Sequence, residues 1–187
     1  YLKKYEGCIL FYSSKFNRNT ILRIQRQNAI GARSGALGNS TVSVSDMWSA
    51  HHNQAGLAFV DKTQVGICYE NRFAISQLGL KSGVAVVPIK GGTFGLTFTS
   101  LGYSKYSESK FGLAYAKKLG EKFSIGIQLD YLSTRIAENY GSKGALAGEI
   151  GFIAKISDHL TLGAHIFNIN RAKIADYNNE RIPTIIR

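Results

Sequence analysis

The alternating stretch from Phe111 to Tyr131 constrains the fold more than any other part of the chain. Its first half alternates apolar or aromatic residues with glycine and alanine, and the alternation resumes after a tight turn over Leu119–Glu121. In the second half one face carries Phe123, Ile125, Ile127, Leu129 and Tyr131, and the other carries Ser124, Gly126, Gln128 and Asp130. Because successive side chains of a strand point to opposite faces, this period of two predicts a β-hairpin with one apolar face. That face has to meet either a second apolar layer or lipid.

The same pattern repeats from residue 62 onward. It predicts strands over Gln64–Arg72, Gly83–Ile89, Thr93–Gly102, Phe111–Lys118, Lys122–Thr134, Leu146–Ile156 and Leu160–Asn170, and a short last strand from Ile182. Tight turns are expected at 90–92, 119–121 and 157–159, and longer polar loops at 73–82, 103–110, 135–145 and 171–181. Short turns at one rim and long loops at the other are typical of an outer-membrane barrel. The predicted fold is all-β, an antiparallel up-and-down meander of seven or eight strands that forms part of a transmembrane β-barrel.

If lipid meets the apolar face, the polar side chains of these strands line an aqueous interior. The candidates for this lumen-facing set are Glu70, Gln128, Asp130, Glu149 and Lys155. Near the long-loop rim, where amphipathic rings favour a membrane interface, we expect Tyr103, Tyr106, Tyr131 and Tyr140. The alternative is a soluble curved sheet whose polar face meets water. The chain has no run of about 18 apolar residues, so no transmembrane helix is predicted.

The first 27 residues are basic and lack a clear period. Residues 1–35 hold seven lysines and arginines against one glutamate, which is more than half of the chain's net charge of +11. The apolar run Cys8–Tyr12 is shorter than a signal-peptide core, so we expect an incomplete or altered leader that behaves as a basic, poorly ordered arm. The alternative is a genuine N-terminal strand. The only two cysteines, Cys8 and Cys68, form no motif.

Residues 28–61 precede the meander and have a different character. The stretch Gly31–Phe59 is rich in glycine and other small residues, and Thr41–Val44 is a candidate short strand. Ser45 or Asp46 is suited to cap a short helix over Met47–His51. Gly56 is expected to end this segment in a left-handed turn.

The order of motifs here resembles the N-terminal signature of the PorV/PorQ-like outer-membrane proteins of Bacteroidetes, relatives of the FadL-type barrels. The matching residues are Gly31-Ala32-Arg33, Gly38-Asn39, Val42, Val44-Ser45-Asp46 and Ala55-Gly56-Leu57-Ala58, and Leu162-Gly163-Ala164 through Asn168 resembles a later strand of the family. The resemblance covers roughly Gly31 to the C-terminus. The sequence His52-Asn53-Gln54-Ala55 departs from the family's Trp-Asn-Pro-Ala. Family barrels have about fourteen strands, so the chain looks truncated after Arg187, and an open, curved sheet is expected.

The resemblance implies a non-enzymatic protein of the bacterial outer membrane that needs no cofactor. It places the short helix of residues 28–61 in the barrel mouth or lumen as a partial plug, and we call these residues the plug segment. Its candidate functional residues are Asp46, Trp48, His51, His52 and Asn53. Two roles are implied, a channel for apolar small molecules or an accessory of type IX secretion. The implied partners are outer-membrane lipid and either secretion-system proteins or an apolar molecule.

Catalytic and metal chemistry have less support in the sequence. His51 and His52 are adjacent, so on a helix they point about 100° apart and do not easily hold one ion. Asp130 and Glu149 lie on neighbouring predicted strands and on the same face, which suits a hydrolase pair or a polar lumen wall. A set of Ser133, His165 and Asp130 lacks the strained nucleophile turn of hydrolases. No catalytic, metal or cofactor site is predicted.

Two soluble alternatives stay open. Basic residues and tyrosines interleave in Tyr1–Tyr12 and Tyr103–Lys110, a combination that suits single-stranded nucleic acid. The cations are scattered over turns and loops, which makes nucleic acid the less favoured partner. The other alternative is a soluble β-barrel or curved sheet that binds lipid, with the apolar face inward.

Overall fold

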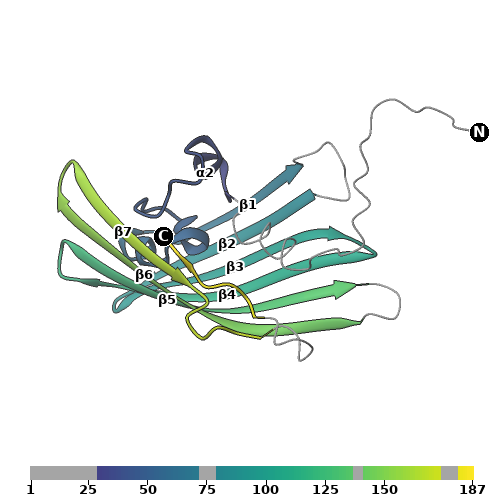
Figure 1. Ribbon diagram of the computed structural model, residues 1–187. Helices are drawn as coiled ribbons and strands as arrows, with labels where there is room; N and C mark the ends of the chain where they lie inside the picture. Colours follow the sequence, from purple (N-terminus) through teal and green to yellow (C-terminus); the bar gives the residue numbers. More distant parts are fainter. Residues whose placement is uncertain (1–28, 72–78, 137–140, 174–180) are drawn as a thin grey trace, which may run out of the picture.

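The described chain forms one open antiparallel sheet in which each strand pairs with the next along the sequence (Figure 1). The computed structural model describes residues 29–71, 79–136, 141–173 and 181–187. The strands are β1 (Gln64–Asn71), β2 (Gly79–Ile89), β3 (Gly92–Tyr103), β4 (Tyr106–Leu119), β5 (Phe123–Ile136), β6 (Ser142–Ser157), β7 (Leu160–Phe167) and β8 (Ile185–Ile186). In the described part of the chain before β1 lie three short helices, α2 (Ala32–Ala36), α3 (Ser49–His52) and the 3-10 helix η1 (Gln54–Phe59). The predicted all-β meander is confirmed, and within the described residues β8 does not pair with β1.

The strands run further toward one rim than the apolar alternation predicts. The predicted long loop over 103–110 is wrong, because Tyr103 pairs with Tyr106 and the two-residue connection between them is tight. β2, β5 and β6 likewise extend into the predicted loops at 73–82 and 135–145. These extensions carry serine, lysine and arginine, whose backbones continue the ladder without an apolar face to reveal it. Tyr140, the remainder of the predicted loops and the basic arm over 1–27 lie outside the described residues.

The plug segment differs from its predicted form in three ways. Thr41–Val44 is a turn and not a strand, closed by the Val44 N–H on the Thr41 carbonyl at 3.1 Å. The short helix begins at Ser49 and carries no side-chain cap, so the predicted cap by Ser45 or Asp46 is wrong; Asp46 Oδ1 instead accepts the Trp48 N–H, at 2.9 Å, just before the helix. Gly56 lies inside η1 and adopts no left-handed conformation. It has to be glycine because a Cβ there would overlap the Ser49 side chain and the Val44 carbonyl.

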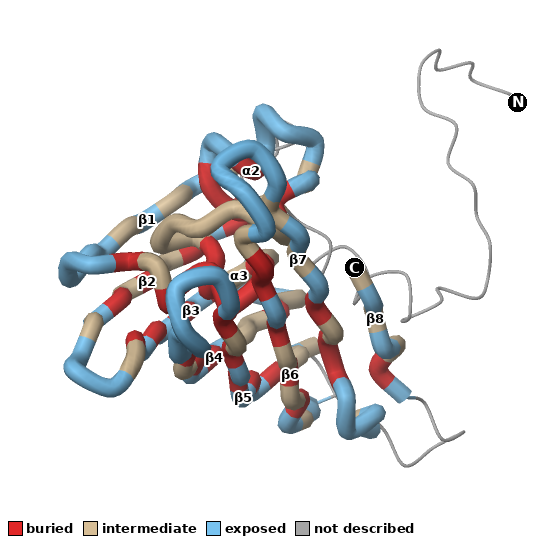
Figure 2. Tube along the Cα trace, turned by 90° about the vertical axis from the view of Figure 1, so that its left-hand side faces the viewer, coloured by how far each residue is buried: buried red, intermediate tan, exposed pale blue. Residues whose placement is uncertain are grey.

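The two faces of the sheet follow the predicted alternation. The inner face is the one that the plug segment covers, and buried and exposed residues alternate along the strands (Figure 2). On β5, Ile127 and Leu129 point outward and are each 55% exposed, whereas Gln128 and Asp130 point inward and are buried. None of the helices in the described residues is long and apolar enough to cross a membrane.

The plug segment packs on the inner face through small residues. Its Ala50, Leu57, Ala58 and Val60 form an apolar cluster with Val84 and Val86 of β2 and Ala114 and Ala116 of β4. Inner-face glycines let its backbone approach the sheet closely. A Cβ on Gly126 would overlap the backbone of η1, and one on Gly151 would overlap the Asn53 side chain. The glycine positions on the inner face therefore fix where the plug segment sits.

Candidate functional site on the inner face

A lysine between two carboxylates forms the centre of the inner face. The Lys110 ammonium on β4 lies 2.8 Å from Glu149 Oε1 on β6 and 3.1 Å from Asp130 Oδ2 on β5. Both carboxylates are fully buried, and the Lys110 side chain is only 13% exposed. Gln128 donates a further hydrogen bond of 2.7 Å to Asp130 Oδ1. Three adjacent strands thus share one buried charge cluster, and burial makes each charge depend on its partners.

Glu149 also ties this cluster to β7 and to the plug segment. His165 Nε2 on β7 lies 2.9 Å from Glu149 Oε2. Gln54 of η1 donates its side-chain amide to the same oxygen at 2.5 Å. One carboxylate therefore joins β4, β6, β7 and the plug segment, and it is the central polar contact between plug and sheet.

A second group of hydrogen bonds holds the backbone of the plug segment. The Asn53 amide donates to the carbonyls of Val42, Phe152 and Ala164 at 2.6, 3.1 and 3.3 Å. The Ser124 hydroxyl of β5 donates to the Ala55 carbonyl at 2.9 Å. Asn53 is completely buried, so these bonds satisfy a polar group that water does not reach.

The two plug histidines have different partners. His51 Nε2 lies 3.3 Å from the Gly83 carbonyl of β2, and His52 Nε2 lies 3.0 Å from the Ile30 carbonyl. Burial, together with the nearby charges of Lys110 and His52, lowers the pKa of His51 to about 3. Burial likewise lowers the pKa of His52. The described residues contain no group of three or more His, Cys, Asp or Glu that could hold a metal ion.

We expect acid to loosen the plug segment. When the plug segment leaves the sheet, His51 would have an ordinary pKa near 6.5. The released state therefore binds a proton below about pH 6.5, whereas the seated state binds it only near pH 3. The contribution of His51 to the free energy of seating is therefore constant above about pH 6.5 and falls below it, by up to about 1.4 kcal/mol per pH unit. Trp48, the only tryptophan, stacks on His51 with ring centroids 5.9 Å apart, so its fluorescence reports the release of the plug segment.

A pH titration of this fluorescence tests the assignment. H51Q should shift the release of the plug segment to lower pH. H159Q, in the exposed turn between β6 and β7, should leave it unchanged, and equal profiles for the two variants would contradict the assignment.

The other predicted residues lie away from the charge cluster. Lys155 faces inward with its ammonium 3.6 Å from the centre of the Phe59 ring, at the rim where the plug segment leaves the sheet. Glu70 is half-buried on β1, and its position in the strand alternation places it on the inner face. Asp46 pairs with Arg33 at 3.3 Å within the plug segment. The predicted lumen-facing set thus shares one face but divides between the central cluster, β1 and the rim.

The candidate residues from the sequence do not include three groups that contact Asp130 or Glu149, namely Lys110, His165 and Gln54. Lys110 falls in the predicted loop 103–110, although Glu108 and Lys110 are in phase with the small residues Gly112, Ala114 and Ala116. The sequence groups His165 with Ser133 and Asp130, but Ser133 lies in register with Ser109 on the outer face and so points away from Asp130. For Gln54 the sequence offers no signal, because its partner Glu149 is 95 positions away.

These features define a class of protein. The described chain is an open antiparallel meander whose outer face is largely apolar and whose inner face is buried, carries a polar charge cluster and is covered by the plug segment. No family model matches the chain, and comparison with curated proteins and with solved structures finds no match either.

Proposed function

We propose that this chain forms part of a transmembrane β-barrel of the bacterial outer membrane. Lipid contacts the outer face, and the plug segment occupies the lumen. The observation that supports this best is the outer face itself, where apolar side chains of neighbouring strands stand at the same height.

The strand register aligns these side chains into a belt with a sharp edge. Phe98, Phe111 and Tyr131 are direct neighbours on β3, β4 and β5. One outward position further along these strands, toward the rim where β3 connects to β4, lie Ser100, Ser109 and Ser133, which also pair with one another. An aromatic row that borders a polar row is the arrangement expected at the boundary between hydrocarbon and headgroups.

The height of the belt fits a bilayer. On β5 the outward apolar residues run from Phe123 to Tyr131, roughly 26 Å at about 3.3 Å per residue. Strands tilted by about 40° would turn this length into roughly 20 Å across the membrane, close to the apolar band of about 25 Å in outer-membrane barrels.

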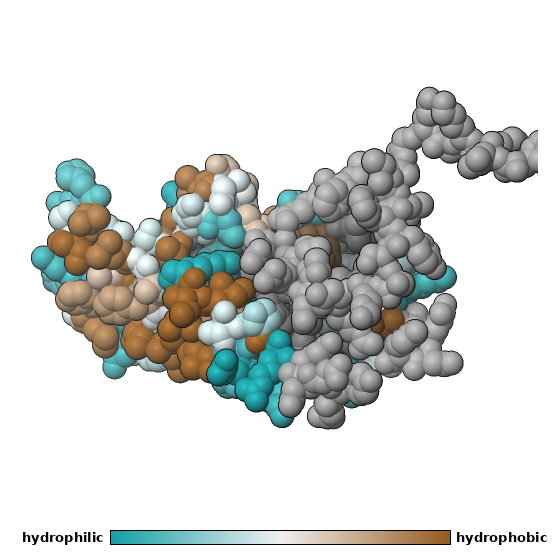
Figure 3. Space-filling view, viewed as in Figure 1, coloured by the Kyte–Doolittle hydropathy of each residue, from teal (hydrophilic) through white to brown (hydrophobic). Residues whose placement is uncertain are grey.

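A soluble sheet explains this surface less well. Exposed side chains on the outer face include Ile67, Leu96, Leu113, Phe123 and Leu162, and apolar atoms gather over the left-hand and lower part of the view in Figure 3. Soluble monomers rarely expose large contiguous apolar patches. The apolar side chains face away from the plug segment. A soluble lipid-binding barrel would instead have its apolar side chains on the inner face. The Tyr103–Lys110 stretch offers little to nucleic acid, because Lys110 is bound to buried carboxylates.

The inner face supports a non-enzymatic role. Asp130 and Glu149 are engaged by Lys110, Gln128, His165 and Gln54, so the pair holds the plug segment and does not present an acid and a base to a substrate. Within the described residues β1 and β8 are the edge strands of the sheet, and a closed barrel requires that both edges be paired. The resemblance in the sequence suggests either a channel for apolar small molecules or an accessory of type IX secretion.

Environment-sensitive labels test this proposal. In a C8S/C68S background, single cysteines at Leu113, Leu129 and Ser133 are labelled with NBD, and the protein is reconstituted into phospholipid vesicles. Labels at Leu113 and Leu129 should emit at shorter wavelength and be quenched by lipid-borne spin labels. The label at Ser133, on the same face of β5, should report a polar surrounding. Polar emission from all three positions would reject the membrane assignment.

A further inference from the structure

We infer that the outer face holds one anionic phospholipid, with an acyl chain in a furrow that opens over β2 and the phosphate at Lys81. This inference rests on the proposed function, since it requires lipid at the outer face. It adds a specific site within that otherwise general surface.

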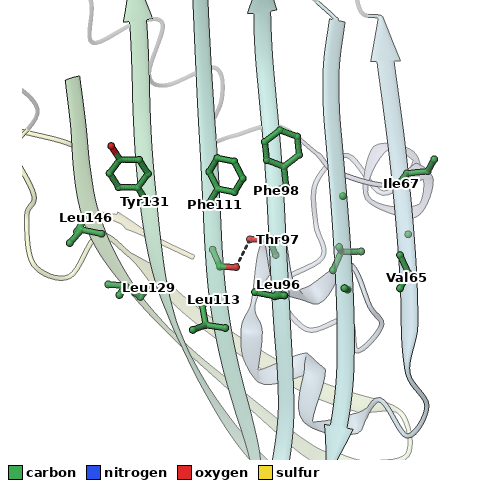
Figure 4. A pocket seen from close by; sticks show the side chains of 15 residues that line it. Val65, Ile67, Leu96, Thr97, Phe98, Phe111, Leu113, Leu129, Tyr131 and Leu146 are labelled. Atoms are coloured by element: carbon green, nitrogen blue, oxygen red, sulfur yellow. Dashed lines mark hydrogen bonds between the residues drawn. The ribbon is translucent and has the colours of Figure 1, made fainter. Parts of the chain in front are cut away.

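The furrow runs across the strands between two rows of side chains (Figure 4). Ile67, Phe98, Phe111 and Tyr131 form one wall, and Val65, Leu96, Leu113 and Leu129 form the other. The floor is the strand backbone at Gly66, Val84, Thr97 and Gly112. Its volume is about 540 Å³, and its lining is almost entirely apolar, so it fits a hydrocarbon chain and offers little to a polar ligand.

Both walls are interrupted at β2. In the register, Gly83 stands between Ile67 and Phe98, and Ala85 stands between Val65 and Leu96. The two small residues leave a gap where every neighbouring strand has a large side chain. The gap continues along β2 toward the polar edge of the belt and connects the furrow with that edge.

Lys81 stands at the end of this gap. It is the next outward residue of β2 after Gly83, about 7 Å further along the strand. It is exposed and lies in register with Tyr69 and Ser100, in the polar row that borders the belt. Among the described residues no carboxylate lies within ion-pair distance of it. A cation at the headgroup level beside an apolar furrow complements a phosphate with an attached acyl chain.

The test counts phospholipids retained on the purified protein by native mass spectrometry. Wild type in detergent, supplied with phosphatidylglycerol or phosphatidylcholine, should retain one molecule of phosphatidylglycerol. G83L fills the gap and should weaken retention about tenfold. It should fold normally, because the nearest atom to a Cβ at Gly83 is 3.9 Å away. K81Q should remove the preference for the anionic lipid. G148L is the matched control, since Gly148 also has open space around it and does not line the furrow.

Each outcome has a distinct meaning. Equal retention by wild type and G83L would overturn the furrow, and an unchanged headgroup preference in K81Q would overturn the assignment of the phosphate to Lys81. Insertion into phosphatidylcholine vesicles is measured in parallel. Wild type that inserts without retaining phosphatidylglycerol would overturn only this inference, whereas wild type that fails to insert would overturn the proposed function. Trp48 fluorescence confirms that each variant keeps its plug segment seated.

Discussion

Replacing Ile127 with lysine is expected to prevent membrane assembly, whereas S133K on the same strand is expected to assemble normally. Ile127 lies in the middle of the apolar belt, in register with Tyr115 and Ile150 on the neighbouring strands. A lysine on the lipid face costs about 2–4 kcal/mol at the bilayer midplane and about 0–1 kcal/mol near the interface. Ser133 lies in the polar row beyond Tyr131, so the proposed geometry places its lysine among headgroups.

Vesicle assembly measures this difference directly. The unfolded protein is diluted from urea into phospholipid vesicles, and the inserted fraction is read from protection against protease and from the altered electrophoretic mobility of the unheated protein. I127K should lose most of the inserted fraction that S133K retains. Both substitutions place the same cation at an outward position of β5, so they compare two depths on one strand. An equal inserted fraction for the two variants would contradict the lipid belt.

Removing Lys110 is expected to produce the largest loss of stability on the inner face. K110M leaves Asp130 and Glu149 buried without the cation that lies 3.1 and 2.8 Å from them. Removing one partner of a buried ion pair costs about 3–5 kcal/mol, because the remaining charge stays desolvated. Lys118 offers a matched control on the same strand and face. Its side chain is 46% exposed, and its ammonium makes only a long ion pair, 3.9 Å, with the exposed Asp61 carboxylate. K118M should change the free energy of unfolding by no more than about 1 kcal/mol.

Urea titration of the assembled protein, followed by Trp48 fluorescence, compares these variants. Neutralising the carboxylates as well, in K110M/D130N/E149Q, should restore much of the lost stability, because the unpaired charges disappear while the side-chain volumes remain. If K110M unfolds at the same urea concentration as K118M, the charge cluster does not hold the inner face together. If the triple variant is as unstable as K110M, the loss comes from the missing lysine side chain and not from the unpaired carboxylates.

The sequence alone determined the class of the fold and the two faces of the sheet. Alternation is a local property, because the direction of each side chain follows from the parity of its position in the strand. For this reason Gln128, Asp130 and Glu149 could be assigned to one face and Ile127 and Leu129 to the other. The same signal begins too late on β4, because serine, glutamate and lysine occupy the first positions of its ladder, before Phe111, where the backbone pairing is already formed.

Only the tertiary structure decided which polar residues meet. Lys110, Asp130, Glu149 and His165 come from four strands, and the strand register brings them together. A register depends on turns and on pairing along the whole ladder, so the pattern within one strand does not fix it. The position of the plug segment is equally non-local, since Gln54 and Asn53 find their partners about 100 residues away, at places where glycines leave room for them. Period-two patterns set the side of the sheet on which a residue lies, and long-range pairing sets its neighbours.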